Sequence, residues 1–285
     1  NKFSKIIIGT AQFGFKFGIN NQNNNIKQTD VNSILTFAKK NYINIFDTAE
    51  NYKHSERRIG KYFEKNLNSF HIISKFNHNR LHKINLSLKK LKLNKLQTLL
   101  IHNPSELKSE ADVLKVKKDL KKYKSKLEKV GVSINFPFEF FFLQKFKFFK
   151  IFQIPYNILD KRWEKFFKYK KSHIKFYVRS IFLQGLLIAP EKNWPPKLKK
   201  KFNLIKKNLV YLKNRLNRFD EKDLLFNYVY GNKKISKIIV GIERREQIEQ
   251  IPFYLLRKNL KILKKKLINN KMPKLPNDFL TPLKW

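Results

Sequence analysis

Four polar side chains stand at or just beyond the ends of three successive apolar runs. The runs read INIFD, HIISK and TLLIH, and they end on Asp47, Lys75 and His102, while Tyr52 follows Asp47 by a short loop. An acid, a phenol, an amine and an imidazole are groups that proton-transfer sites use. If the runs are parallel strands, their carboxyl ends bring the four groups to one face of a sheet. The pattern therefore predicts a site for proton transfer.

These groups suit the reduction of a carbonyl, which needs a hydride donor and a proton for the developing alkoxide. A free phenol, with a pKa of about 10, is a weak acid near neutrality unless a nearby positive charge favours its ionised form. We expect Tyr52 to be the acid and Lys75 to supply that charge. Asp47 would hold the ammonium in place. His102 would hydrogen-bond the carbonyl oxygen beside the phenol.

Each of the four residues also has an ordinary structural interpretation. Asp47 could cap the turn that follows it, and Tyr52 could be a half-buried aromatic. Lys75 is one of many lysines, and His102 could be a structural histidine before the turn at Asn103–Pro104. Taken singly, these interpretations are favoured. Taken together, the spacing and order of the four residues favour the catalytic interpretation.

The elements that would position these residues alternate along the chain. Apolar runs typical of strands are separated by longer amphipathic stretches typical of helices, as in a parallel sheet with crossover helices. Eight such units without a gap for another domain predict an α/β fold, a single-domain (β/α)8 TIM barrel over residues 1–285 with a tail at about 271–285. The expected strands are Ile6–Gly9, Ile43–Asp47, His71–Lys75, Thr98–His102, Val130–Ser133, Ile151–Gln153, Phe176–Arg179 and Ile238–Gly241.

The expected helices lie between these strands. They are Asp30–Lys40 (capped by Thr29 or Asp30), Ser55–Glu64, Leu81–Leu91, Glu110–Lys126, Phe138–Phe148, Arg162–Lys170, a long basic stretch from Leu198 to Asn217, and Arg245–Gln250. The aromatic residues of the segment from Phe136 to Phe149 are expected to pack against the barrel rather than to bind a ligand or a partner. A barrel would place all strand ends on one rim, and this set is unusually rich in polar and titratable residues.

The composition narrows the function classes. The chain has 63 Lys and Arg residues against 21 Asp and Glu residues, a formal net charge of +42. Such a charge would suit a nucleic-acid or anionic-membrane surface. The lysines are, however, spread over nearly every expected helix, and the abundance of Lys, Asn, Ile and Phe is typical of a strongly AT-biased genome. We therefore favour compositional drift over a specific nucleic-acid site.

The chain has no cysteine, which excludes disulfides, a thiolate nucleophile and a cysteine-ligated metal. No cluster of His, Asp and Glu has metal-ligand spacing, so we expect no metal site. No apolar stretch reaches eighteen residues, and the first run ends too soon, at Gly9, for an export signal. We expect a soluble, cytoplasmic protein without a membrane partner. The sequence favours neither a monomer nor a homo-oligomer.

The sequence resembles the aldo/keto reductase family over nearly its whole length. GTAQFGFKFGI is similar to the family's first-strand segment, and FDTAENYKHSERRIG to its D-T-A-x-x-Y-G-x-S-E-x-x-x-G signature. Later strand-end motifs follow in the family's order as LLIHNP, GVSIN, FQIPYNILD, VRSIFLQGLL and IIVGIERREQIEQ. The details are most similar to a bacterial branch often found with sugar and polysaccharide enzymes. The resemblance implies the same tetrad, and reduction of an aldehyde or ketone, with sugar-derived carbonyls to be tested first.

The resemblance also implies a nicotinamide cofactor at the barrel mouth, NADPH with NADH as the alternative. The sequence has no G-x-G-x-x-G after a strand, so we expect no Rossmann-type site. In the family's arrangement, two polar strand ends bond the carboxamide, Arg179 stacks on the nicotinamide, and the following loop approaches the pyrophosphate. The adenosine phosphate would lie at the start of the last helix, although Arg244 is equally well explained as a solvated helix start. The implied residues are Ser133, Gln153, Arg179, Ser180, Leu183 through Gly185, Gly241, Arg244 and Gln247.

Three residues depart from the family pattern. Lys53 replaces the usual Gly after the catalytic Tyr, and could reshape the loop that carries it. Ile134 replaces an Asn that follows the Ser, a loss for which Asn135 could compensate. Ile251 replaces an Asn that contacts adenine. Substrate specificity is expected from Phe13–Asn25, from the stretch after His102, from Pro190–Pro196 with Trp194, and from Met272–Trp285.

Two other functions remain open at this point. The chain could be a nicotinamide-cofactor-binding sensor or scaffold with little turnover, although the intact tetrad argues against it. It could also be a polyanion-binding protein that retains a barrel. A diffuse coat of lysines should release a nucleic acid as salt rises, so binding that survives physiological salt would favour this third function.

Overall fold

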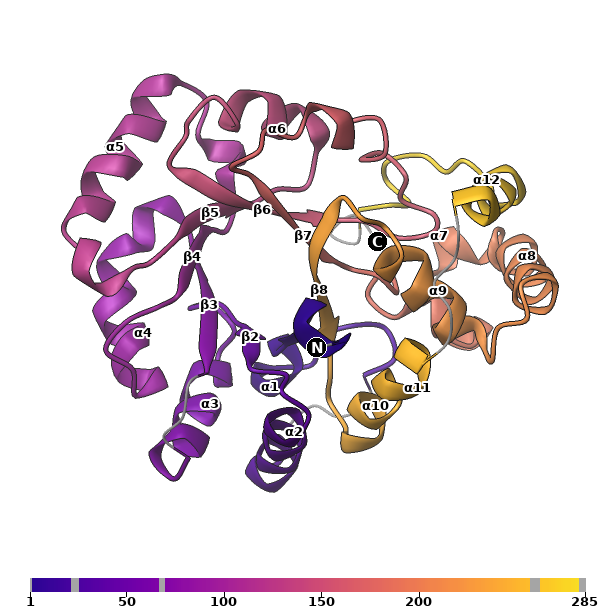
Figure 1. Ribbon diagram of the computed structural model, residues 1–285, viewed down its shortest axis with the longest axis horizontal. Coiled ribbons are helices and arrows are strands. Elements are labelled where there is room, and N and C mark those ends of the chain that lie inside the picture. The colour runs from indigo at the N-terminus through magenta and orange to yellow at the C-terminus, as the bar shows by residue number, and fades with distance from the viewer. Residues whose placement is uncertain (1, 22–25, 67–69, 257–261, 282–285) are drawn as a thin grey trace.

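Eight parallel strands form a closed barrel in the computed structural model, and helices surround the barrel (Figure 1). The structure describes residues 2–21, 26–66, 70–256 and 262–281. Each strand pairs with the next along the chain, and the first pairs with the last, with Ile6 opposite Ile238 and Gly9 opposite Gly241. The predicted (β/α)8 fold is thus confirmed.

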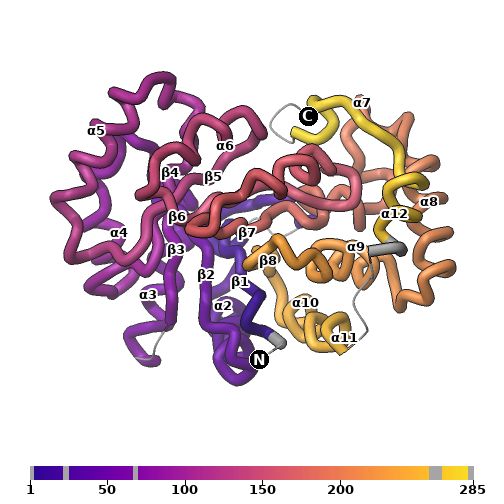
Figure 2. The backbone as a smooth tube through the Cα atoms, turned by 45° about the horizontal axis from the view of Figure 1, so that its top comes forward, coloured from indigo at the N-terminus to yellow at the C-terminus, as the bar shows by residue number. Residues whose placement is uncertain are grey.

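The strands are β1 (Ile6–Gly9), β2 (Ile45–Asp47), β3 (His71–Phe76), β4 (Thr98–Ile101), β5 (Val130–Ser133), β6 (Phe149–Pro155), β7 (Lys175–Arg179) and β8 (Ile235–Gly241). The α-helices are α1 (Ala11–Gly14), α2 (Gln28–Lys40), α3 (Ser55–Glu64), α4 (Ile84–Leu91), α5 (Glu110–Lys121), α6 (Pro137–Leu143), α7 (Pro196–Lys199), α8 (Phe202–Arg215), α9 (Glu221–Tyr230), α10 (Arg245–Glu249), α11 (Ile251–Leu256) and α12 (Ile262–Lys271). Single turns of 3₁₀ helix are η1 (Lys2–Lys5), η2 (His78–Lys83), η3 (Pro104–Glu106), η4 (Lys124–Lys126), η5 (Phe167–Tyr169), η6 (Leu186–Ile188) and η7 (Glu191–Asn193). Figure 2 shows α7, α8 and α12 together at one side of the barrel.

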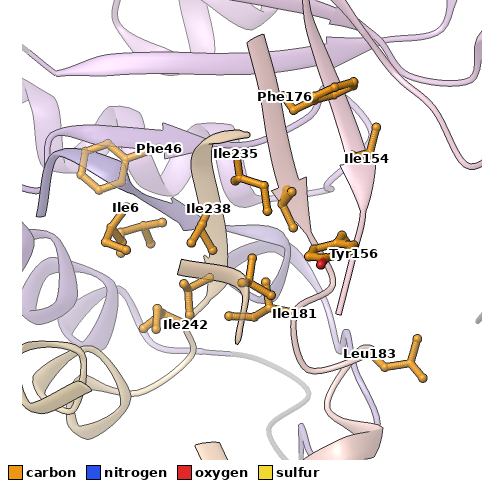
Figure 3. Close-up of a cluster of buried hydrophobic side chains, with 14 of the residues drawn as sticks. Ile6, Phe46, Ile154, Tyr156, Phe176, Ile181, Leu183, Ile235, Ile238 and Ile242 are labelled. Atoms are coloured by element: carbon orange, nitrogen blue, oxygen red, sulfur yellow. The ribbon is translucent and has the colours of Figure 1, made fainter. Parts of the chain in front are cut away.

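The apolar core is divided in two because side chains alternate across the barrel wall. Ile6 and Ile8 belong to a large outer cluster between strands and helices, part of which Figure 3 shows. Ile7 belongs to a small separate cluster with one side chain from most other strands, namely Ile73, Leu100, Ile151, Tyr177 and Ile239. These side chains fill the interior, so the barrel is packed rather than open. A ligand can therefore bind only at its rim.

Most predicted helices form, but several bounds are wrong. The segment predicted as the helix Arg162–Lys170 contains turns and only the short η5, although its Trp163 and Phe167 are buried in the core. The aromatic helix ends at Leu143, five residues early. Its inner residues Phe140 and Leu143 are buried as predicted, whereas Phe138 is 68% exposed. Neither Thr29 nor Asp30 caps α2, because the helix already begins at Gln28.

Other differences affect the ends of elements and the region after β7. The helix expected from Leu198 to Asn217 is divided into α7 and α8. Helices α9 and α12 were not predicted. Helix α9 is buried on nearly every side, from Asp223 to Val229, so it lacks the amphipathic period that marks a surface helix. The side chains of Glu164 and Asn269 join α12 to the barrel through Tyr156 and Tyr228.

Candidate active site

The carboxyl ends of the strands border one cavity of about 660 Å³. All eight residues that the sequence places on this rim line it, namely Gly9, Asp47, Lys75, His102, Ser133, Gln153, Arg179 and Gly241. The parallel register explains this convergence, since it pairs Gly9 with Asp47 and Ser133 with Gln153 across neighbouring strands. Tyr52, from the loop between β2 and α3, also lines the cavity.

Lys75 forms a buried ion pair with Asp47 at the wall of the cavity. Its Nζ donates to Asp47 Oδ2 at 2.6 Å and to the Thr48 carbonyl at 2.8 Å, and it lies 3.5 Å from Tyr52 Oη. Burial by itself would lower the pKa of Lys75, but the Asp47 carboxylate and the Tyr52 hydroxyl raise it above its ordinary value. The side chain is therefore an ammonium at neutral pH, and its charge faces the phenol oxygen.

The loop that carries Tyr52 is fixed by hydrogen bonds at its base. The Ser55 N–H donates to the Tyr52 carbonyl at 2.9 Å, and Ser55 Oγ donates to the Thr10 carbonyl at 2.9 Å. Gly14 packs so closely that a Cβ there would lie 1.8 Å from the Tyr52 carbonyl oxygen. A larger residue at Gly14 would push the loop away. Lys53 adopts a left-handed φ of +43°, which a Gly would adopt freely, so the substitution strains the loop.

His102 is the first residue after β4, and its ring meets the edge of Tyr52. The two ring centroids are 6.0 Å apart and the planes are inclined at 78°. Burial, together with the positive charges of Lys75 and Arg179, lowers the pKa of His102 to about 3. The imidazole is therefore neutral at physiological pH. It can donate one hydrogen bond to an oxygen beside the phenol without carrying a charge.

The low pKa of His102 predicts a pH dependence of stability. The unfolded chain takes up a proton at His102 below pH 6.5, whereas the folded protein does so only near pH 3. Stability should therefore fall as the pH drops through this window. Because the ring is partly exposed, we expect the free energy of unfolding to fall by about 1–2 kcal/mol more in the wild type than in His102→Gln between pH 7 and 5. Urea unfolding at both pH values measures this difference, and equal losses would contradict it.

Gln153 and Ser133 form a hydrogen-bonded chain that ends at Asp47. Gln153 Nε2 donates to Asp47 Oδ1 at 2.8 Å, and Ser133 Oγ donates to Gln153 Oε1 at 3.2 Å. The Asp47 carboxylate is thus held from both sides, by Lys75 and by Gln153. The side chain of Gln153, which the resemblance assigns to the cofactor, is in this structure a positioning group for Asp47.

Comparison with known proteins agrees with this geometry. The model of the aldo/keto reductase family matches residues 5–268. The chain belongs to the aldo/keto reductase family. Family membership supports an oxidoreductase that interconverts carbonyl and alcohol groups. No curated protein matches the sequence.

Solved structures of other family members have the same fold. A glycerol dehydrogenase from Gluconobacter oxydans superposes with a TM-score of 0.76 at 18% identity, covering 94% of this chain and 90% of that one. An aldo-keto reductase from Bacillus halodurans, in its holo form, gives 0.77 at 16% identity, covering 95% and 93%. At these identities the likeness extends to the fold alone.

The departures from the aldo/keto reductase pattern have clear structural outcomes. Ile134 is fully buried, and the next residue, Asn135, turns into the cavity instead. Asn135 Oδ1 accepts a hydrogen bond from Arg179 Nη2 at 2.6 Å, which holds the guanidinium at the rim. Ile251 is also buried, at the start of α11.

The segment after β7 has an unusual backbone. Ser180, Leu183 and Gln184 have positive φ values of +60°, +50° and +52°, and Gly185 follows at +90°. Each non-glycine residue in this conformation costs about 1 kcal/mol or more, and such strain gathers at functional sites. Segments of this kind can turn backbone N–H groups toward an anion. All four residues line the cavity.

The residues expected at the adenosine end are only partly brought together. Gly241 and Gln247 line the cavity, whereas Arg244 is exposed and does not line it. Helix α10 is only five residues long. Gln247 Oε1 accepts hydrogen bonds from the N–H groups of Glu243 and Arg244, at 2.9 and 3.3 Å. The interpretation of Arg244 as a solvated helix start fits this position.

The sequence reasoning missed several cavity residues and placed one wrongly. Trp194 is buried against Phe202 and Phe279 and does not line the cavity. Residues 22–25 and 282–285 of the expected specificity segments lie outside the described residues. Missed residues from loops after the strands are Asn51, Asn77, Arg162 and Glu243. Most of them lie within four residues of a predicted strand end or of Tyr52, and that proximity was the available signal.

No helix in the described part of the chain is long and apolar enough to cross a membrane. Among the same residues, no group of three or more His, Asp or Glu side chains is arranged to hold a metal ion.

Proposed function

We propose that the protein is a nicotinamide-dependent reductase of aldehydes or ketones in which Tyr52 donates the proton. The observation that carries this proposal is the position of Tyr52 Oη, 3.5 Å from the buried Lys75 ammonium and beside the neutral His102 ring, at a cavity. A carbonyl oxygen placed there would meet two hydrogen-bond donors. The ammonium favours negative charge on the phenol oxygen as its proton leaves.

Three features of the cavity support a nicotinamide dinucleotide as its ligand. Its volume of about 660 Å³ lies within the range of roughly 300–1,000 Å³ that is typical of ligand pockets. The strained segment from Ser180 to Gly185 offers a backbone cradle for phosphates, and one oxygen of the buried Glu243 carboxylate lacks a partner. Such a cofactor supplies the hydride when it is bound. Ser133 and Arg179 would hold the nicotinamide end of the dinucleotide, and Gln247 would hold its adenosine end.

In this mechanism the residues of the chain have distinct tasks. Tyr52 delivers its proton to the carbonyl oxygen, and Lys75 stabilises the phenolate that remains. Asp47, held by Gln153, fixes the ammonium. His102 donates to the same carbonyl oxygen and orients the substrate. Water then has to return the proton to Tyr52 before the next turnover.

We further propose a polar, sugar-derived carbonyl as the substrate. The cavity wall carries the carboxamides of Asn51, Asn77 and Asn103, beside the aromatic rings of Phe15 and Phe17. Carboxamides bond hydroxyl groups as donors and as acceptors. The glycerol dehydrogenase among the structural relatives is likewise named for a polyhydroxylated compound.

Oxidation of NADH and NADPH, measured with a panel of sugar aldehydes, ketoses and simple aldehydes, tests this proposal. We expect turnover with at least one carbonyl, and a higher kcat/KM for polyhydroxylated ones. Binding of a dinucleotide without reduction of any carbonyl would instead support a sensor or scaffold. Failure to bind either dinucleotide would overturn the proposal altogether.

A further inference from the structure

We propose that Glu243 selects the dinucleotide and makes this protein prefer NADH to NADPH. The inference rests on the proposed function and adds the identity of the cofactor. NADH and NADPH differ only in a phosphate on the adenosine ribose, where NADH has a free 2′-hydroxyl. A carboxylate accepts a hydrogen bond from that hydroxyl but repels the phosphate, whereas an arginine favours the phosphate.

Glu243 presents an incompletely bonded carboxylate at the cavity wall. It lies two residues beyond β8, lines the cavity and is only 8% exposed. Its Oε1 accepts from Gln247 Nε2 at 3.3 Å, while its Oε2 is buried without a partner. An unpartnered buried carboxylate oxygen costs free energy. A hydroxyl donor reached by a small rotation of this side chain would remove that cost.

Burial raises the pKa of Glu243. The hydrogen bond with the Gln247 side chain and the charge of Arg244 lower this pKa, but by less. Among the described residues, no Lys, Arg or His side chain forms an ion pair with this carboxylate. Its position matters because the Tyr52 end of the cavity is occupied by the reacting groups. In the proposed function the phosphates lie against the segment after β7, and β8 is the neighbouring strand in the barrel, so the adenosine half would lie beside Glu243.

The charges along the cavity support the same preference. The Lys and Arg side chains among the described residues that line it are Lys75, Arg162 and Arg179. Lys75 is paired with Asp47, Arg162 with Asp160 at 2.7 Å, and Arg179 is bonded to Asn135. Each cation thus already has a partner, and none comes from the segment after β8.

At the β8 end, the polar side chains that line the cavity are those of Gln12, Glu243 and Gln247. The charge of Arg244 acts on Glu243, but neither of the two arginines that follow Glu243 lines the cavity. Arg244 is exposed outside the cavity wall. Arg245 is bonded to Glu249 and to Ser33. A phosphate on the ribose would therefore meet a carboxylate rather than a cation.

Equilibrium binding of NADH and NADPH to the intact protein tests this inference without relying on activity. Tryptophan fluorescence quenching or calorimetry gives the Kd of each dinucleotide for the wild type, Glu243→Gln and Glu243→Arg. We expect the wild type to bind NADH about tenfold or more tightly than NADPH. Glu243→Gln, which keeps the shape of the side chain, should bring the two affinities close together. Glu243→Arg should favour NADPH.

Glu246→Gln is the matched control, because Glu246 is exposed on α10, three residues after Glu243, and does not line the cavity. It should keep the wild-type ratio. Tighter binding of NADPH by the wild type, or an unchanged ratio in Glu243→Gln, would overturn the inference and leave the proposed function standing. If the folded wild type binds neither dinucleotide, both fail.

Discussion

Replacing Tyr52 with Phe is expected to lower kcat for carbonyl reduction by about 10²- to 10⁴-fold while leaving the Kd for the dinucleotide unchanged. The substitution removes one oxygen atom, the proposed proton donor, and keeps the ring between Phe15 and His102. The expected loss is confined to the chemical step because the ring's packing persists. Single-turnover reduction of the best substrate of the panel, together with fluorescence titration of the dinucleotide, measures the two quantities.

Tyr42→Phe is a suitable control for this experiment. Tyr42 is 76% exposed, lies in the turn that leads into the amino end of β2, and does not line the cavity. Its loss of a hydroxyl should leave both kcat and Kd as they are. A Tyr52→Phe variant with wild-type turnover would remove the proton donor from the mechanism. A variant that no longer binds the dinucleotide would show that the hydroxyl has a binding task instead.

Replacing Lys75 with Met should reduce both activity and stability. The methionine retains the length of the side chain but removes the ammonium that lies 3.5 Å from Tyr52 Oη, so kcat should fall by about 10²- to 10³-fold. The Asp47 carboxylate would then stay buried with Gln153 and without its cation. Breaking one half of a buried pair costs about 3–5 kcal/mol, which urea unfolding would detect.

The double variant Asp47→Asn with Lys75→Met separates these two effects. It removes both charges, so most of the lost stability should return, while kcat should stay low because the phenol still lacks its neighbouring ammonium. If the double variant regained activity as well, the ammonium would have only a structural task. If Lys75→Met alone unfolded like the wild type, the ion pair between Lys75 and Asp47 would not be the buried pair described here.

Local pattern in the sequence was enough to predict the strand ends. β-Prone runs had to be buried in the barrel wall, and polar residues ended those runs because the rim is where the chain meets solvent and ligand. The pattern of the sequence therefore predicts the places of Asp47, Lys75 and His102. Parallel pairing, which the alternation of strands and helices required, brought them to the same rim.

Helices were harder to predict where tertiary contacts override the local period. The segment from Arg162 to Lys170 has a helical pattern of aromatic residues, yet Trp163 and Phe167 are drawn into separate contacts with the core. Helix α9 was not predicted, because it is buried on nearly all sides and so lacks the polar face by which a surface helix is detected. Both errors arise because the surroundings of a segment, rather than its own residues, decide which faces are covered.

The sequence by itself determined the fold and the rim on which the four polar residues lie, since these follow from the order of apolar runs and the types of residue that end them. Only the tertiary structure decided which side chains on the rim bond to one another and which of them face the cavity. The bond from Gln153 to Asp47 joins residues 106 positions apart. The exclusion of Arg244 and the unpartnered oxygen of Glu243 depend on the direction in which a loop leaves its strand. The direction of a loop and the partners of its side chains are set by contacts between segments that are distant in the sequence. The periodicity of the sequence does not predict such contacts.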